Sequence, residues 1–168
     1  FHVEIPSHIV PAPEAAAEAS GERPRPDFAP HILVAEDNET NRFVLSLYLK
    51  KIGMTYEMAP TGADALQAWE SGRFDLILMD IEMPVLDGFE TTRELRRREI
   101  ASDRPGTPII ALSADAMAEN RDMAFQVGMD EFLTKPIEID RLGNAIWALI
   151  IQYLDTNSQS ASGHRDRA

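Results

Sequence analysis

Five short apolar segments alternate with five longer segments of helical periodicity, and this alternation limits the fold more than any other feature. The apolar segments span residues 31–35, 54–59, 75–79, 107–112 and 131–134, and the helical ones span residues 39–52, 61–70, 87–99, 117–127 and 138–154. Strands that alternate with helices make right-handed crossovers and form a parallel sheet covered on both faces. We therefore predict an α/β protein with a doubly wound, five-stranded parallel sheet and five helices.

Local signals support these boundaries. Gly53, Gly72 and Gly128 each follow a helical segment, where a glycine commonly ends a helix. Thr61 and Asp64 form a capping-box-like helix start. Residues 75–79 are apolar on both faces, as a central parallel strand requires. The expected strand order is 2-1-3-4-5, which is that of flavodoxin-like folds.

The two ends of the chain differ from this pattern. Residues 1–30 contain six prolines in an Ala- and Glu-rich stretch, which predicts a linker that leads from an upstream region. Residues 155–168 are polar and small, which predicts a disordered C-terminal tail. The expected domain is therefore residues 31–154.

The composition excludes several classes of partner. The chain has 28 acidic and 16 basic side chains, a formal net charge of −12 that would repel a nucleic-acid backbone. It has no cysteine, and no apolar stretch approaches the roughly 20 residues of a membrane span. We expect a cytoplasmic fragment of a longer protein that contacts neither nucleic acid nor membrane, while the parent protein is free to carry a membrane anchor. The sequence leaves the oligomeric state open.

Chemically active side chains follow four of the predicted strands. They are Glu36 and Asp37 after the first strand, Asp80 after the third, Ser113 after the fourth and Lys135 after the fifth. The carboxyl ends of parallel strands meet at one edge of the sheet, where ligands bind in such folds. Taken singly, each residue is most simply a loop residue or a helix cap. Their joint placement favours a shared site.

This set of side chains suits one chemistry. Neighbouring carboxylates repel each other unless a cation joins them, and oxygen ligands suit Mg²⁺, with Mn²⁺ as an alternative. Phosphoryl transfer depends mainly on positioning and on neutralising the phosphoryl oxygens. We expect Mg²⁺, Lys135 and Ser113 to provide that neutralisation, which leaves the Asp80 carboxylate as the nucleophile.

Four sequence blocks resemble the signature blocks of response-regulator receiver domains of two-component signalling. They are VAEDN at 34–38, LMDIEMP at 78–84 with DG at 87–88, ALSA at 111–114 and TKP at 134–136. The resemblance covers residues 31–154. It implies that Asp80 is phosphorylated, that Asp37, Asp80 and the Glu82 backbone carbonyl bind Mg²⁺, and that Glu36 acts through water. It also implies that Ser113 and Lys135 bind the phosphoryl group.

Three further positions have two interpretations each. The resemblance implies a cis peptide before Pro136, whereas a proline there is otherwise common in the first turn of a helix. Phe132 matches the family's aromatic switch position and is equally well explained as a core residue. The Glu82 side chain is expected to affect the lifetime of the phosphoryl group, in a direction that the sequence does not give.

The first helical segment has a second, partly apolar stripe, Thr40, Phe43, Val44 and Leu47, away from the Asn41, Leu45, Tyr48 and Ile52 face. This stripe is either buried packing or a docking surface for a helical partner. The resemblance favours the dimerisation helices of a histidine kinase or a histidine phosphotransfer protein.

The resemblance also indicates the parent protein. Residues 37–42 look like receivers that are fused to hybrid sensor histidine kinases, and residues 1–6 are similar to the last strand of a kinase ATP-binding domain. The fragment itself would catalyse only its own phosphorylation and dephosphorylation. Two alternatives remain: a degenerate receiver that serves as a binding module, and a Mg²⁺-dependent phosphohydrolase of the haloacid-dehalogenase type.

Overall fold

The structure, a computed structural model, describes residues 27–162. The predicted linker up to residue 26 and the similarity of residues 1–6 to a kinase strand lie outside the described residues. Phe28 already packs edge-on against Trp147 of the last helix, with ring centroids 6.5 Å apart. The Pro30 carbonyl accepts a hydrogen bond from the Thr55 amide. The last residues of the predicted linker therefore belong to the folded domain.

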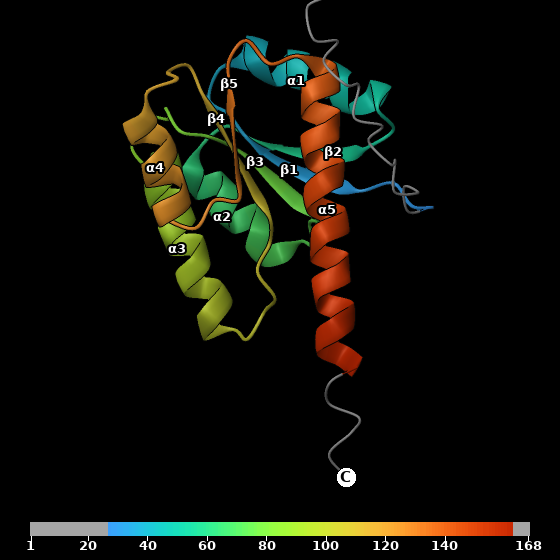
Figure 1. Cartoon of the computed structure of the whole chain (residues 1–168). Coiled ribbons are helices and arrows are strands. Elements are labelled where there is room, and N and C mark those ends of the chain that lie inside the picture. The colour runs from blue at the N-terminus through green and yellow to red at the C-terminus, as the bar shows by residue number, and fades with distance from the viewer. Residues whose placement is uncertain (1–26, 163–168) are drawn as a thin grey trace, which may run out of the picture.

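A five-stranded parallel sheet forms the centre of the domain (Figure 1). Its strands are β1 (His31–Ala35), β2 (Thr55–Ala59), β3 (Leu76–Asp80), β4 (Ile109–Ser113) and β5 (Glu131–Thr134). Their order is β2-β1-β3-β4-β5, which confirms the predicted topology. Every residue of β3 and β4 is buried, whereas β2 lies at an edge and alternates exposed and covered positions. This difference explains why only the central strands are apolar on both faces.

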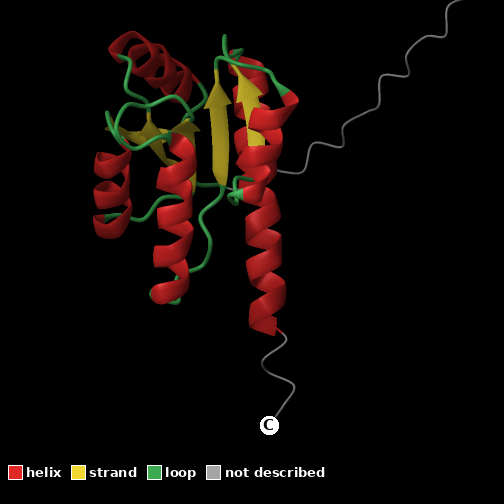
Figure 2. Cartoon of the chain, turned by 90° about the vertical axis from the view of Figure 1, so that its left-hand side faces the viewer, coloured by secondary structure: helices red, strands yellow, loops and turns green. Residues whose placement is uncertain are grey.

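Five helices cover the two faces of the sheet (Figures 1 and 2). They are α1 (Glu39–Lys51), α2 (Gly62–Ser71), α3 (Gly88–Ala101), α4 (Ala118–Gln126) and α5 (Ile139–Ser162). One core cluster joins the sheet to α1 and α5, and a second joins it to α2, α3 and α4. Among residues 27–162, no helix is long and apolar enough to cross a membrane.

Three helices that start at the carboxyl end of the sheet have a side-chain N-cap. Asn38, Thr61 and Asp87 accept hydrogen bonds from backbone amides in the first turns of α1, α2 and α3. Each cap satisfies an amide that lacks a partner within the helix. Because α1 and α3 begin directly after the loops that follow β1 and β3, these caps also fix the geometry of those loops.

The last helix is longer than the sequence pattern predicted. We expected it to end near residue 154 and a disordered tail to follow, but α5 continues to Ser162 and extends beyond the sheet (Figures 1 and 2). The prediction relied on apolar positions, which end at Leu154. The backbone continues as a helix because neither glycine nor proline occurs between Gly143 and Gly163.

Candidate functional site

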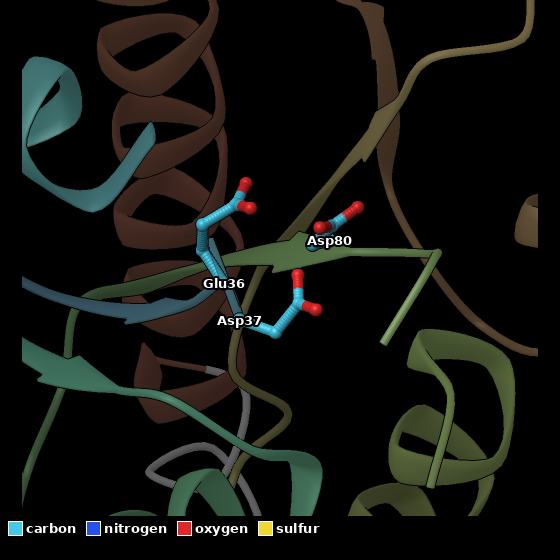
Figure 3. Close-up of side chains that lie close together, drawn as sticks. All are labelled: Glu36, Asp37 and Asp80. Atoms are coloured by element: carbon cyan, nitrogen blue, oxygen red, sulfur yellow. The ribbon is translucent and has the colours of Figure 1, made fainter. Parts of the chain in front are cut away.

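Three carboxylates meet at the carboxyl ends of β1 and β3. Glu36 and Asp37 directly follow β1, and Asp80 is the last residue of β3. One oxygen from each lies within 4.8 Å of the other two, and Figure 3 shows Asp37 and Asp80 directed toward the same space. Glu36 and Asp80 are buried, whereas Asp37 is exposed. The sequence prediction that these residues come together is correct.

Lys135, directly after β5, joins this group. Its Nζ atom lies 2.8 Å from Glu36 Oε2 and 3.0 Å from Asp80 Oδ2. The other Glu36 oxygen accepts hydrogen bonds from the Asn38 amide at 3.2 Å and from Asn41 Nδ2 at 3.0 Å. Both Glu36 oxygens are therefore engaged by the protein, and the role of Glu36 through water stays a prediction.

The charges at the site do not balance. Asp80 is 2% exposed, and burial together with the nearby Glu36 charge raises the pKa of its carboxyl to about 6 against the lowering effect of Lys135. Burial alone would lower the pKa of Lys135, but hydrogen bonds to Glu36 and Asp80 raise it overall. Lys135 therefore stays protonated at neutral pH. One ammonium group then faces three carboxylates, which leaves two excess negative charges when all three are ionised.

A divalent cation fits this arrangement chemically. All the candidate ligands are oxygens, which Mg²⁺ prefers, and Asp37 gives solvent access for the waters that Mg²⁺ retains. Two oxygens on opposite sides of one Mg²⁺ lie about 4.2 Å apart, so oxygens within 4.8 Å of one another are close to the required spacing. The Glu82 amide donates to Asp80 Oδ1 at 3.1 Å, and the Glu82 side chain is exposed. A ligand role for the Glu82 carbonyl stays a prediction.

The loop between β3 and α3 packs tightly against the backbone of Asp80. Gly88, the first residue of α3, donates its amide to the Ile81 carbonyl at 3.0 Å. A Cβ atom at this position would lie 2.3 Å from the Asp80 carbonyl oxygen, so only glycine fits. In the same loop, Val85 has a φ of 71° and is fully exposed, a strained conformation for a β-branched residue.

Ser113 lies at the predicted strand end, but its hydroxyl makes no hydrogen bond to the three carboxylates among the described residues. It is buried as the last residue of β4, and its hydroxyl donates to the Asp115 carbonyl and accepts from the Asp115 amide, both at 3.0 Å. The Asp115 side chain in turn accepts from the Met117 amide just before α4. The serine hydroxyl is therefore held in a local turn, and its predicted contact with a phosphoryl group requires a change of partner.

Phe132 and Pro136 lie on β5 and directly after it. Phe132 is 3% exposed and belongs to the core cluster that packs on α2, α3 and α4. A buried ring is compatible with a core role and with the inward position of a switch, so the switch stays a prediction. The peptide bond between Lys135 and Pro136 is cis.

The second stripe of α1 is exposed. Phe43 is 63% exposed, Leu47 48% and Val44 37%, and Thr40 is also exposed. The structure thus contradicts the alternative that this stripe is buried packing within the domain. Leu45 and Leu49 form the buried face of α1 instead.

Sequence reasoning missed two residues in the first turn of α1. Asn41 was assigned to the face that packs on the sheet, but its side chain binds the Glu36 carboxylate. Arg42 was not assigned a role, and its guanidinium group donates to the backbone carbonyls of Glu36 and Asp37. The only available signal was a pair of adjacent polar residues shortly after the acidic residues, which is common at helix starts.

Comparisons with known proteins agree with this geometry. The family model of the response regulator receiver domain matches residues 32–147. Hybrid signal transduction histidine kinase E of Dictyostelium discoideum is 39% identical over 125 residues, which cover 72% of this chain and 7% of the kinase. The chain thus spans less than a tenth of the length of that relative.

Two solved structures are similar in both fold and sequence. The receiver domain of a sensor histidine kinase from Pseudomonas aeruginosa PAO1, with a magnesium ion coordinated in its active-site cleft, is 36% identical with a TM-score of 0.66, covering 73% of this chain and 98% of that one. The receiver domain of the response regulator Ssk1 from Saccharomyces cerevisiae, crystallised with the histidine phosphotransfer protein Ypd1, is 30% identical with the same TM-score, covering 74% and 91%.

Proposed function

The chain belongs to the response regulator receiver domain family, and from this premise we propose that Asp80 accepts a phosphoryl group from a phosphohistidine in a Mg²⁺-dependent reaction. The observation that carries the proposal is the buried Asp80 carboxylate at the meeting point of Asp37, Glu36 and Lys135. Bound Mg²⁺ would neutralise charge on the transferring phosphoryl group and on the surrounding carboxylates. Asp37 and Asp80 would hold it directly.

Asp80 acts as the nucleophile in this proposal. One carboxylate oxygen forms the new bond to phosphorus while the bond between phosphorus and the imidazole nitrogen breaks, and the leaving imidazole then takes up a proton from solvent. In this proposal Lys135, whose Nζ atom lies 3.0 Å from Asp80 Oδ2, binds a phosphoryl oxygen next to the new bond. The Glu82 amide, which donates to Asp80 Oδ1, helps to orient the carboxylate.

Ser113 binds the phosphoryl group only after a rearrangement. Its hydroxyl would exchange the Asp115 carbonyl for a phosphoryl oxygen, which would loosen the turn that leads into α4. The Phe132 ring is already buried, so the family's switch would hold it in this inward position rather than move it there. This coupling would carry the phosphorylation signal from the site to the surface around α4 and β5.

The donor docks on α1. The exposed apolar stripe of Thr40, Phe43, Val44 and Leu47 begins in the first turn after the acidic residues, so a helical partner that covers it would bring its phosphohistidine close to Asp80. The related receiver that was crystallised with a phosphotransfer protein supports a partner of this class. The similarity to a hybrid kinase supports a parent protein of that kind, with this domain as its receiver.

Two alternatives make different predictions for one experiment. Wild-type protein is incubated with Mg²⁺ and acetyl phosphate, and its intact mass is measured over time. We expect the mass to rise by one phosphoryl group, and we expect no change for Asp80→Asn or when Mg²⁺ is removed by EDTA. A degenerate receiver would show no adduct at all. A phosphohydrolase would release many equivalents of phosphate per protein with common phosphate esters.

A further inference from the structure

Arg42 binds the backbone of the acidic turn. Its terminal nitrogen donates to the Glu36 carbonyl at 2.8 Å and to the Asp37 carbonyl at 2.7 Å. The Arg42 amide is itself fixed in the first turn of α1, where it donates to the Asn38 carbonyl at 3.0 Å. One guanidinium group thus connects the start of the helix to two successive peptide units that carry the acidic pair.

The three carboxylates of the site are held in different ways. Glu36 is held through both oxygens by Lys135, Asn41 and the Asn38 amide. Asp80 is held by Lys135 and the Glu82 amide. In the part of the chain whose side chains the structure describes, the exposed Asp37 carboxylate has no hydrogen-bond partner. Its direction therefore depends on the backbone of the turn, which is the part that Arg42 binds.

General electrostatics do not favour an arginine at this position. The amino end of a helix carries a partial positive charge that favours anions, and Arg42 lies in the first turn of α1. A cation beside a divalent-cation site also opposes metal binding through charge repulsion. The two carbonyl contacts are the interactions in the structure that explain a guanidinium group here.

We infer that Arg42 is a positioning residue for the cation site: it fixes the peptide units of Glu36 and Asp37 so that the free Asp37 carboxylate faces Asp80. This inference rests on the proposed function, because it concerns the same Mg²⁺ site. The geometry and the charge of Arg42 have opposite effects on Mg²⁺ affinity. Loss of Arg42 misaligns Asp37 and weakens metal binding, whereas loss of the positive charge alone would strengthen it.

The test measures Mg²⁺ affinity without any phosphodonor. Isothermal titration of Mg²⁺ is carried out on wild type, Arg42→Met, Arg42→Lys and the control Arg141→Met, an exposed arginine on α5. We expect Arg42→Met to weaken Mg²⁺ binding about tenfold, since removal of groups that orient metal ligands typically costs 10- to 100-fold. Arg42→Lys, which keeps a donor and the charge, should recover part of the loss. The control should match wild type.

The remaining outcomes separate this inference from the proposed function. Equal or tighter Mg²⁺ binding by Arg42→Met overturns the inference, because charge rather than positioning would then dominate. If Arg42→Met does not fold, as judged by thermal unfolding in EDTA, Arg42→Lys decides: a weakened site supports the inference and an unchanged site overturns it. Absence of Mg²⁺ binding by wild type would instead reject the proposed function. In the phosphorylation assay, Arg42→Met should need more Mg²⁺ and should still form the adduct when Mg²⁺ is raised.

Discussion

The two ends of the sheet both carry buried charges, but they differ in how far hydrogen bonds satisfy their carboxylates. At the amino end, Arg96 of α3 donates to the Gly128 and Thr107 carbonyls and forms ion pairs with Glu99 at 2.7 Å and Asp130 at 3.2 Å. At the carboxyl end, the single ammonium of Lys135 faces the three carboxylates of the site. The amino end has one cation for two carboxylates and the carboxyl end has one for three, and among the described residues the Asp37 carboxylate has no hydrogen-bond partner.

The amino-end carboxylates are also satisfied by other donors. The second Glu99 oxygen accepts from the Thr107 amide at 2.6 Å, and Asp130 accepts from the Ile109 amide and the Tyr153 hydroxyl, both at 2.8 Å. These bonds connect α3, β4, the loop before β5 and α5. The same residue types thus stabilise the fold where each carboxylate oxygen has a partner and provide a reactive site where a carboxylate has none.

The largest expected effect is a loss of stability when Arg96 at the amino end of the sheet is substituted. Arg96→Met should lower the free energy of unfolding by about 3 kcal/mol, because it leaves the mostly buried Glu99 and Asp130 without their cation. The matched control is Arg97→Met on the same helix. The Arg97 side chain is 69% exposed and pairs with Glu94, so this variant should leave the stability close to that of wild type. Urea denaturation measures both. An equal loss of stability in the two variants would show that the Arg96 contacts do not stabilise the amino end of the sheet.

At the carboxyl end of the sheet, removal of a charge is expected to stabilise the protein rather than destabilise it. Asp80→Asn should raise the free energy of unfolding by about 1–3 kcal/mol in the absence of Mg²⁺, since a pKa raised from 3.8 to about 6 corresponds to about 3 kcal/mol of unfavourable charge burial. Lys135 keeps Glu36 as a partner in this variant. Asp37→Asn, which changes an exposed carboxylate, serves as the control and should change stability less. A destabilised Asp80→Asn protein would show that the Asp80 charge is compensated after all.

The stability difference between wild type and Asp80→Asn should also depend on pH. Between about pH 4 and pH 6, the folded protein holds the Asp80 proton more tightly than the unfolded chain does, because the folded pKa is the higher one. The stability of wild type relative to Asp80→Asn should therefore fall as the pH rises through this window, by up to about 3 kcal/mol. Parallel denaturant titrations from pH 4 to pH 7 measure the difference. A difference that does not change with pH would place the Asp80 pKa near its ordinary value.

The smallest expected effect is stabilisation by the metal. At a Mg²⁺ concentration of ten times the dissociation constant, the free energy of unfolding of wild type should rise by about 1.4 kcal/mol. Asp80→Asn should gain less, because it lacks one of the two direct ligands, and thermal unfolding with and without Mg²⁺ measures both. An equal gain in the two proteins would place the cation away from Asp80.

The fold was largely predictable because its signals are local. The strands β3 and β5 are short runs with apolar residues, and a charged side chain stands at the end of β3 and directly after β5, so Asp80 and Lys135 could be assigned to the same edge of the sheet. The end of α5 could not be assigned, because its last turns carry polar residues without a helix-breaking glycine or proline before Gly163. Only a short part of the prediction therefore failed.

The hydrogen bonds that hold the charged groups at the two ends of the sheet were not predictable, because they depend on which distant groups a long side chain contacts in the folded protein. Arg96 contacts Gly128, which is 32 residues away, and no periodicity distinguishes it from its exposed neighbour Arg97. Arg42 likewise lies among polar residues at a helix start. The Ser113 hydroxyl forms two hydrogen bonds with the Asp115 backbone in a local turn. The position of Ser113 at a strand end does not predict these bonds.

Asp80, among the acidic residues of the site, is expected to carry the phosphoryl group. After incubation with Mg²⁺ and acetyl phosphate, the protein is reduced with borohydride, which converts an aspartyl phosphate to homoserine, and its peptides are mapped by mass spectrometry. We predict homoserine at position 80 in wild type, and unmodified aspartate at positions 37 and 115. Homoserine at one of those positions, or reduction that depends on neither Mg²⁺ nor acetyl phosphate, would show that Asp80 is not the phosphorylated residue.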